Sequence, residues 1–289
     1  MVTKEKCIVL FSGGLDSRLA IKIMQEKGYE VLPVFFNLPF GTGCCSEACS
    51  FNFAQLHNLK LKIIDCSKGK LLQEYLNIVK QAKHGTGAGI NPCIDCRIFM
   101  LKKTKQFADK NKIKFIATGE VTGQRPMSQQ KKQIELIEKE TGLGNRIIRP
   151  LIDFGIKGRS RKKQIELAKK FKIKYPHPAG GCLLCEKQLK DRLNYLLSRG
   201  MNEKEIKLVN VGRHFVINKC WVVIGRNQTE NKIIENLGVG KLIELDYPAP
   251  SAIILDNNKT MDKKVKDLVK AYSKKGSLKE RKTFEGLKL

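Results

Sequence analysis

The stretch Phe-Ser-Gly-Gly-Leu-Asp-Ser at residues 11–17 constrains this chain more than any other. It follows an apolar run at residues 7–10 and opens a helical pattern of apolar residues, so it predicts the turn between a β-strand and an α-helix. Two glycines let an anion approach the backbone, while the serine hydroxyls and the first N–H groups of the helix donate hydrogen bonds. Asp16 would repel a phosphate unless a cation lay between them, so we expect it to bind Mg²⁺.

This turn is not a Walker loop, which has a longer glycine spacing and a lysine. It resembles the pyrophosphatase loop (PP loop) of the adenine-nucleotide α-hydrolase group, whose members cleave ATP to AMP and pyrophosphate and adenylate an oxygen atom of their substrate. The alternative is an ordinary strand-to-helix turn rich in small residues. The resemblance implies that ATP contacts Phe11, Ser12, Gly13, Gly14, Leu15, Asp16 and Ser17.

Further apolar strands are predicted at residues 30–37, 61–65 and 114–118, with helical patterns at 45–57, 68–82 and 131–140. Strands that alternate with helices predict an α/β fold with a doubly wound parallel sheet. Such sheets bind ligands at the carboxyl ends of their strands, where Phe35, Thr118 and Gly119 are expected to meet the nucleotide. For Phe35, packing in the core is an equal alternative.

A change of composition near residue 199 predicts a domain boundary. Residues 1–199 would form the ATP pyrophosphatase domain. Residues 200–289 contain a predicted hairpin at 212–227, a helix at 228–237, two strands at 241–245 and 251–255, and a lysine-rich helix from about 259, which together indicate a smaller α+β domain.

Two Cys-x-x-Cys pairs form a second predicted centre. Cys93 and Cys96 open a basic helix that continues to about residue 110, so both face the same way, and the helix N-terminus is expected to lower their pKa. Cys182 and Cys185 follow a loop rich in proline and glycine. A thioredoxin-type redox pair would directly follow the first strand, where the PP loop already lies, so we favour a metal or sulfur centre. The remaining cysteines are expected to be buried thiols, except Cys44 and Cys45, whose loop should overhang the site.

The charge of the chain indicates a polyanionic partner. There are 55 Lys and Arg against 28 Asp and Glu, a net charge of +27, although a lysine-rich composition can also be general to a proteome. The polar run at residues 121–129 can hold an RNA phosphate or a base edge. The residues expected to contact RNA are Arg125, Arg149, Arg159, Arg161, Arg213, His214 and Arg226. Ten cysteines without a leader or a long apolar run indicate a cytoplasmic protein with no membrane segment.

The order of these motifs resembles that of tRNA thiouridine synthases of the 4-thiouridine-synthetase-like or 2-thiouridylase-like kind, over about residues 5–195. In their iron–sulfur-dependent members, the resemblance implies, cysteines that match Cys93, Cys96 and Cys182 hold a [4Fe-4S] cluster with one iron open. The stretch 212–227 resembles the RNA-binding domain of NFACT proteins. Cys185 departs from the pattern as a fourth cysteine that could close the site or favour zinc, and the stretch 150–158 is shorter than in the family.

We therefore expect an ATP-dependent tRNA sulfurtransferase that adenylates a uridine carbonyl oxygen and then inserts sulfur. Its cofactors would be ATP, Mg²⁺ and a [4Fe-4S] cluster, with Zn²⁺ as the alternative metal. Its partners would be tRNA and a sulfur donor, either sulfide or a sulfur-carrier protein, and a homodimer is left open. Three alternatives remain: thiolation by a cysteine persulfide without a cluster, an RNA-binding protein with a zinc site and an inactive ATP site, and an amide ligase, which would have no use for the cysteines. Cys185 is expected to point away from an open cluster or to be displaced by sulfide.

Overall fold

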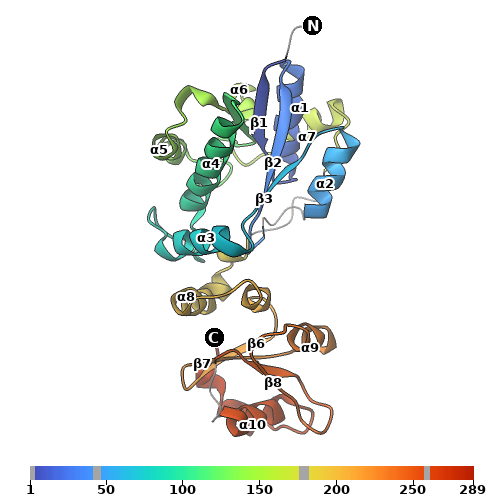
Figure 1. The fold of residues 1–289 in the computed structure, drawn as a ribbon, viewed down its shortest axis with the longest axis vertical. Helices are drawn as coiled ribbons and strands as arrows, with labels where there is room; N and C mark the ends of the chain where they lie inside the picture. The colour runs from blue at the N-terminus through green and yellow to red at the C-terminus, as the bar shows by residue number, and fades with distance from the viewer. Residues whose placement is uncertain (1–3, 42–46, 176–181, 257–260) are drawn as a thin grey trace. The chain divides into compact units, whose positions relative to one another are not determined.

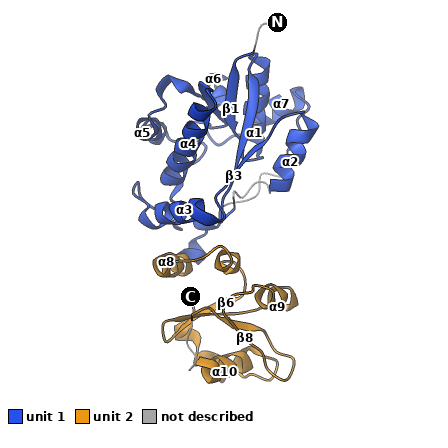
Figure 2. Ribbon diagram, in the orientation of Figure 1, with its two compact units in different colours: residues 1–190 blue, residues 191–289 orange. Residues whose placement is uncertain are grey.

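The computed structural model describes residues 4–41, 47–175, 182–256 and 261–289. The chain forms two compact units, residues 1–190 and 191–289 (Figure 2). Cys44 and Cys45, for which we expected a place over the site, lie outside the described residues. In the described part of the chain, no helix is both long and apolar enough to cross a membrane.

The first unit is built on a five-stranded sheet in the order β3-β2-β1-β4-β5 (Figure 1). All its strand pairs are parallel. The strands are β1 (Lys6–Leu10), β2 (Glu30–Asn37), β3 (Lys62–Asp65), β4 (Phe115–Thr118) and β5 (Ile147–Ile148). The order of the strands reverses between β1 and β4, which is where open α/β sheets bind ligands. The predicted α/β class and the parallel sheet are confirmed.

Helices cover both faces of this sheet (Figure 1). On one face lie α1 (Leu15–Glu26), α2 (Glu47–Leu56), α6 (Pro150–Asp153) and α7 (Lys162–Lys170), which share a core with β1 and β4. On the other lie α3 (Gly69–Gln81), α4 (Cys93–Lys110) and α5 (Lys131–Thr141), with α4 in contact with both of its neighbours. The core residues of α1, among them Leu15, Leu19 and Ile23, recur at the three- and four-residue spacing of one helix face.

The second unit contains an antiparallel four-stranded sheet in the order β6-β7-β9-β8. Its strands are β6 (Arg213–Ile217), β7 (Cys220–Ile224), β8 (Lys241–Ile243) and β9 (Ala252–Ile254), and its helices are α8 (Lys190–Arg199), α9 (Gln228–Glu235), α10 (Asp262–Tyr272) and α11 (Leu278–Lys282). Apolar residues of α10 pack on one face of the sheet. The guanidinium of Arg199, at the end of α8, lies 5.4 Å from the ring centre of Trp221. Helix α8 therefore belongs with this α+β unit, although we expected the boundary after it.

Candidate active site

The PP loop follows β1 and leads directly into α1, as predicted. Ser17 Oγ donates to the carbonyl of Gly14 at 2.9 Å and lies 3.3 Å from both Ser12 N and Ser12 Oγ. Gly13 has a positive φ of 76°, a conformation that favours glycine. Arg18 Nε donates to the Gly13 carbonyl at 2.7 Å, which turns this carbonyl towards the protein. The loop is therefore held in shape by its own hydroxyls and by one buried arginine.

Gly119 follows β4 and touches the PP loop. A Cβ atom on Gly119 would lie 2.7 Å from the carbonyl carbon of Asp16 and 2.7 Å from Ser17 N. Only glycine permits this approach, because real Cβ atoms essentially never come so close to a backbone. The carboxyl ends of β1 and β4 thus meet at the site.

Asp16 carries the features of a cation ligand. Burial raises the pKa of its carboxyl group, while nearby amides of Gln124 and Gln164 and the charge of Arg161 lower it. Its Oδ1 is buried and has no hydrogen-bond partner among the described residues, and the same holds for Gln164 Oε1. Unpaired buried oxygens beside a phosphate loop suit Mg²⁺, which takes oxygen ligands and keeps several waters. The residues present therefore fit this ion.

The second cysteine pair is fixed to the first by backbone contacts. Cys93 and Cys96 lie on the first turn of α4, and Cys182 directly precedes a short 3₁₀ helix, Leu183–Cys185. The N–H of Asn91 donates to Leu184 O at 2.9 Å, and a Cβ on Gly89 would lie 2.7 Å from that same oxygen. The glycine-rich loop before α4 thus holds the turn of Cys182 and Cys185 beside the helix.

The thiols of this cluster interact directly. Cys93 and Cys182 each hydrogen-bond to Cys185, which lowers the pKa of Cys185 to about 3 and raises the pKa of the other two. Burial raises the pKa of Cys96, whose Sγ lies 3.6 Å from the hydroxyl of Tyr75. The expectation that the helix N-terminus favours thiolates at Cys93 and Cys96 is therefore wrong, because burial and the neighbouring thiols outweigh it. Cys185 does not point away from the other thiols, so this part of the expectation is wrong, whereas its displacement by sulfide stays a prediction.

We tested whether this cluster suits a metal centre. Within the described ranges, no group of three or more Cys, His, Asp and Glu side chains has a geometry ready to hold a metal ion. The donor set itself is suitable, because four cysteines from two turns converge on one pocket and thiolates hold both iron–sulfur clusters and structural zinc. The four cysteines therefore have the donor atoms that an iron–sulfur cluster or a zinc ion requires.

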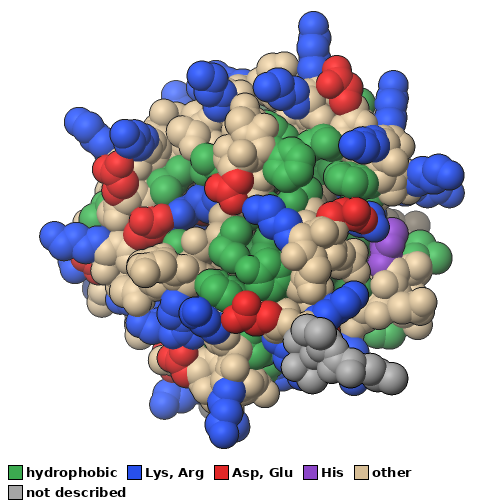
Figure 3. Space-filling view, turned by 90° about the horizontal axis from the view of Figure 1, so that it is seen from above, with side chains coloured by type: hydrophobic (Ala, Val, Ile, Leu, Met, Phe, Trp, Pro, Cys, Tyr) green, Lys and Arg blue, Asp and Glu red, His purple; other side chains and the backbone are tan. Residues whose placement is uncertain are grey.

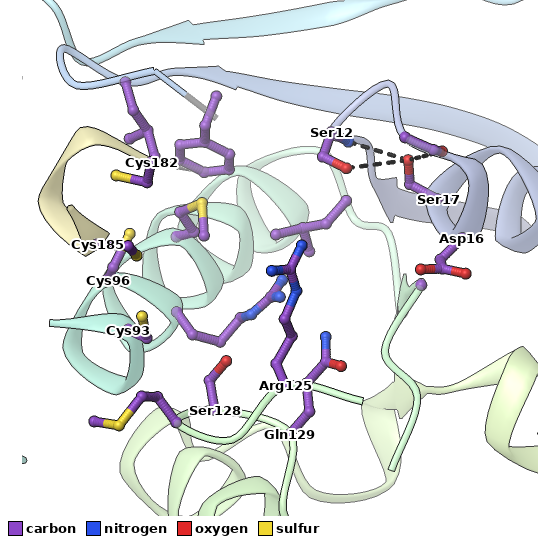
Figure 4. A pocket seen from close by; sticks show the side chains of 18 of the residues that line it. Ser12, Asp16, Ser17, Cys93, Cys96, Arg125, Ser128, Gln129, Cys182 and Cys185 are labelled. Carbon is purple, nitrogen blue, oxygen red and sulfur yellow. Dashed lines mark hydrogen bonds between the residues drawn. The ribbon is translucent and has the colours of Figure 1, made fainter. Parts of the chain in front are cut away.

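The PP loop and the cysteine cluster line one pocket of about 450 Å³. Figure 4 shows Ser12, Asp16 and Ser17 at one side and the four cysteines at the other, with Arg125, Ser128 and Gln129 between them. Val34 and Phe36 of β2 add an apolar wall. A substrate in this space can meet both centres.

Glu120 organises the space between the centres. Its side chain is 1 % exposed and pairs with Arg97 at 3.3 Å and with Arg149 at 2.9 Å. Burial would raise the pKa of Glu120, but these two arginines and the hydroxyl of Thr118 lower it. Arg149 also pairs with Glu138 and is 10 % exposed, so it stabilises the fold and is not a free RNA contact as predicted.

Several other predicted contacts differ in the structure. Phe35 is buried and does not line the pocket, because successive strand residues face opposite ways, and Phe36 lines it in its place. Thr118 is buried, and its hydroxyl donates a hydrogen bond to Glu120 Oε2 at 2.9 Å. His214 is 0 % exposed and so cannot touch RNA. Arg226 pairs with Glu230, with its Nε 2.9 Å from Glu230 Oε1, but its side chain is 46 % exposed, so its RNA contact stays a prediction.

The remaining predicted RNA residues stay accessible in part. Arg125 and Arg161 line the pocket, Arg159 is exposed, and Arg213 is half-buried with its guanidinium 5.2 Å from the ring centre of Tyr272. On the face shown in Figure 3, Lys and Arg side chains are spread around the periphery rather than gathered in one patch.

Some residues in or beside the pocket had no role in the sequence predictions. Arg97 and Tyr75 line the pocket beside Cys96, and Arg18 supports the PP loop. Arg97 could have been found because it directly follows the first cysteine pair on a helix. Tyr75 and Arg18 carry no comparable signal, since their partners are distant in sequence or are backbone atoms.

The fold and the PP loop define an α/β nucleotide-binding protein of the PP-loop class. A family model described as "Thiamine biosynthesis protein (ThiI)" matches residues 2–182, more than half of the chain, and the chain belongs to this family.

Two curated relatives illustrate the different activities that the names of such relatives carry. An argininosuccinate synthase of Geobacillus sp. is 29 % identical over 177 residues, covering 61 % of this chain and 41 % of the relative. A probable tRNA sulfurtransferase of Saccharolobus islandicus is 30 % identical over 182 residues, covering 59 % and 43 %. This chain thus spans about two fifths of the length of these relatives. A solved 4-thiouridine synthetase in complex with RNA and ATP has a TM-score of 0.44 at 20 % identity, over 71 % of this chain and 51 % of that one.

Proposed function

We propose that this protein is an ATP-dependent tRNA sulfurtransferase that converts a uridine to a thiouridine. The observation that carries the proposal is the single pocket lined by both the PP loop and four cysteines. An activating centre and a sulfur centre must reach the same carbon atom in turn, and this pocket brings them together. An amide ligase would use only the PP loop. The name of the argininosuccinate synthase relative likewise gives no role to the four cysteines.

The reaction begins with activation of the base. The uracil carbonyl oxygen attacks the α-phosphorus of ATP, the bond to the pyrophosphate oxygen breaks, and the N3 proton leaves. The N–H groups and hydroxyls of Ser12 to Ser17 hold the phosphates, and Asp16 would hold the Mg²⁺ that neutralises their charge. Arg125 and Arg161 add positive charge to the same pocket.

The second step exchanges oxygen for sulfur. Sulfide forms a bond to the activated carbon, and AMP leaves with the former carbonyl oxygen. With sulfide as the donor, the sum is uridine, ATP and sulfide to thiouridine, AMP and pyrophosphate, without oxidation or reduction. Arg97, held by Glu120 beside the cysteines, favours the approach of an anion.

The cysteines have two proposed uses. Cys93, Cys96 and Cys182 would hold a [4Fe-4S] cluster, which when bound would supply an iron free to bind sulfide. Cys185 lies close enough to be a fourth ligand in a closed zinc site, and a persulfide on Cys182 or Cys96 is the alternative without a metal. Iron and labile sulfide in anaerobically purified protein would separate these mechanisms.

The second unit is proposed to hold RNA. Its exposed lysines and Arg213 suit phosphate contacts, in keeping with an NFACT-type domain that begins near residue 200. We further propose that the protein acts in the cytoplasm and receives sulfur from sulfide or a sulfur-carrier protein. A homodimer is left open.

The decisive experiment is mass spectrometry of tRNA nucleosides from cells with and without the gene. Loss of 2-thiouridine or 4-thiouridine, restored by the wild-type gene and not by an Asp16→Asn copy, is the expected result. Unchanged levels of both nucleosides would refute the proposed function.

A further inference from the structure

The polar loop between β4 and α5 contains one buried amide oxygen, that of Gln129, which no side chain or backbone group in the described part of the chain satisfies. Gln129 is 7 % exposed and lines the pocket, and its Oε1 is buried without a hydrogen-bond partner among the described residues. Gln124 is 9 % exposed and lines the same pocket, but its amide group is directed at Asp16 and lowers the pKa of that carboxyl group, so the argument rests on Gln129. A buried amide atom without a partner is destabilising, so such atoms in a pocket indicate a ligand that pairs with them.

The backbone of this loop holds Gln129 in place. The N–H of Gly123 donates to Gln129 O at 2.7 Å, and the N–H of Gln129 donates to Arg125 O at 3.2 Å. The base of the loop is tied to residue 158, whose N–H donates to Thr122 O at 2.7 Å. With both backbone groups bonded, the position of the Gln129 backbone and the direction in which its side chain leaves it are set before a ligand binds.

The position of Gln129 distinguishes it from residues that serve ATP. Figure 4 shows Gln129 and Ser128 between Cys93 and Asp16, with Arg125 above them. The positive charge of Arg125 acts on both Asp16 and Cys185, which places it between the two centres. The base that is first adenylated and then thiolated must occupy this middle space.

Resting on the proposed function, we propose that Gln129 reads the Watson–Crick edge of the target uracil, with Ser128 beside it and Arg125 on the adjoining phosphate. Uracil presents an N3–H donor between two carbonyl acceptors. The buried Oε1 of Gln129 accepts from N3–H, and its amide group donates to one neighbouring carbonyl, which leaves the other carbonyl for ATP. Single-stranded RNA bases are commonly recognised in this way. Cytosine has a lone pair at N3, so a cytosine in the same position has no N3–H to donate to the buried oxygen.

The test compares binding of the RNA pentanucleotides AAUAA and AACAA to the full chain with a non-hydrolysable ATP analogue present. Wild-type protein is expected to favour AAUAA by about ten-fold or more, the usual value of a good amide-to-base pair. Gln129→Leu should bring this ratio close to one. The matched control is Gln130→Leu, because Gln130 is exposed at the start of α5, makes no capping hydrogen bond and lies outside the pocket lining.

A conservative variant separates recognition from folding. Gln129→Glu keeps the acceptor for N3–H but loses the donor to the carbonyl, so it should keep only part of the preference for AAUAA. A role in packing alone would leave the ratio unchanged in every variant. If Gln129→Leu leaves the ratio unaltered, or weakens the binding of AAUAA and AACAA equally, the inference is overturned. Wild-type protein that forms no thiouridine would overturn the proposed function, so the two failures are distinguishable.

Discussion

Acid should destabilise the second unit through His214. This side chain is 0 % exposed; Trp221 Nε1 donates to its Nδ1 at 3.0 Å, and its Nε2 lies 2.9 Å from Val211 O. The ring is therefore neutral, with the proton on Nε2. A second proton on Nδ1 would face the indole N–H, donor against donor. Burial, with a smaller effect of the nearby Arg192 charge, lowers the pKa of His214 to about 3.

The sign and size of the effect follow from this pKa. Between pH 6.5 and about 3, the unfolded chain binds a proton at His214 that the folded chain does not, so stability falls as the pH falls. Each pH unit in this window lowers the free energy of unfolding by about 1.4 kcal/mol, which amounts to about 2 kcal/mol between pH 7 and pH 5.

The assay uses the single tryptophan of the chain, which lies against His214. Urea unfolding followed by Trp221 fluorescence at pH 7 and pH 5 reports on this unit. His214→Gln keeps a donor and an acceptor without titrating, so it should be less stable at pH 7 but lose about 2 kcal/mol less on acidification. Parallel losses in both proteins would refute the reasoning.

Three further predictions concern the pocket. Asp16→Asn should abolish pyrophosphate release while leaving tRNA affinity nearly unchanged, because one Mg²⁺ ligand is lost and the basic surface stays; normal turnover would contradict the metal role. Gly119→Ala should lower the free energy of unfolding by about 1–3 kcal/mol and slow pyrophosphate release, since its Cβ meets the backbone of Ser17 at 2.7 Å; wild-type rates and melting temperature would show that the loop yields freely. Cys185→Ser should retain iron and labile sulfide after anaerobic purification, whereas Cys93→Ser should lose both, because an open cluster needs only three cysteines; loss of metal in Cys185→Ser would identify a closed site.

Much of the first unit could be predicted because its signals are local. The apolar strand at residues 30–37 coincides with β2, and the helix that opens at Cys93 ends at Lys110 as expected. The PP loop needs only neighbouring residues to define its turn. The failures concern which way a side chain faces: Phe35 and Phe36 are indistinguishable in composition, and only the pleat of β2 decides which one lines the pocket.

Charge was the least reliable guide to RNA contacts. Arg149 is as basic in the sequence as Arg125, but the buried carboxylate of Glu120, distant in the sequence, pairs with it. The sequence predicts His214 as a polar residue of the hairpin that contacts RNA, but its strand position buries it against Trp221. Such pairings depend on tertiary contacts, which no local pattern encodes.

The pocket acquires its two-centre character from two consecutive residues after β4. Gly119 allows the strand end to touch the PP loop, and Glu120 turns back to hold Arg97 beside the cysteines. The end of β4 therefore contacts the PP loop directly and is tied to helix α4, which carries Cys93 and Cys96, through the ion pair of Glu120 with Arg97. Because the carboxylate of Glu120 is buried, moving α4 away from this strand end would break its ion pair with Arg97, which is more destabilising than the loss of an exposed pair. The sequence Thr-Gly-Glu at residues 118–120 thus couples the two halves of the proposed reaction, although none of its three side chains is proposed to react.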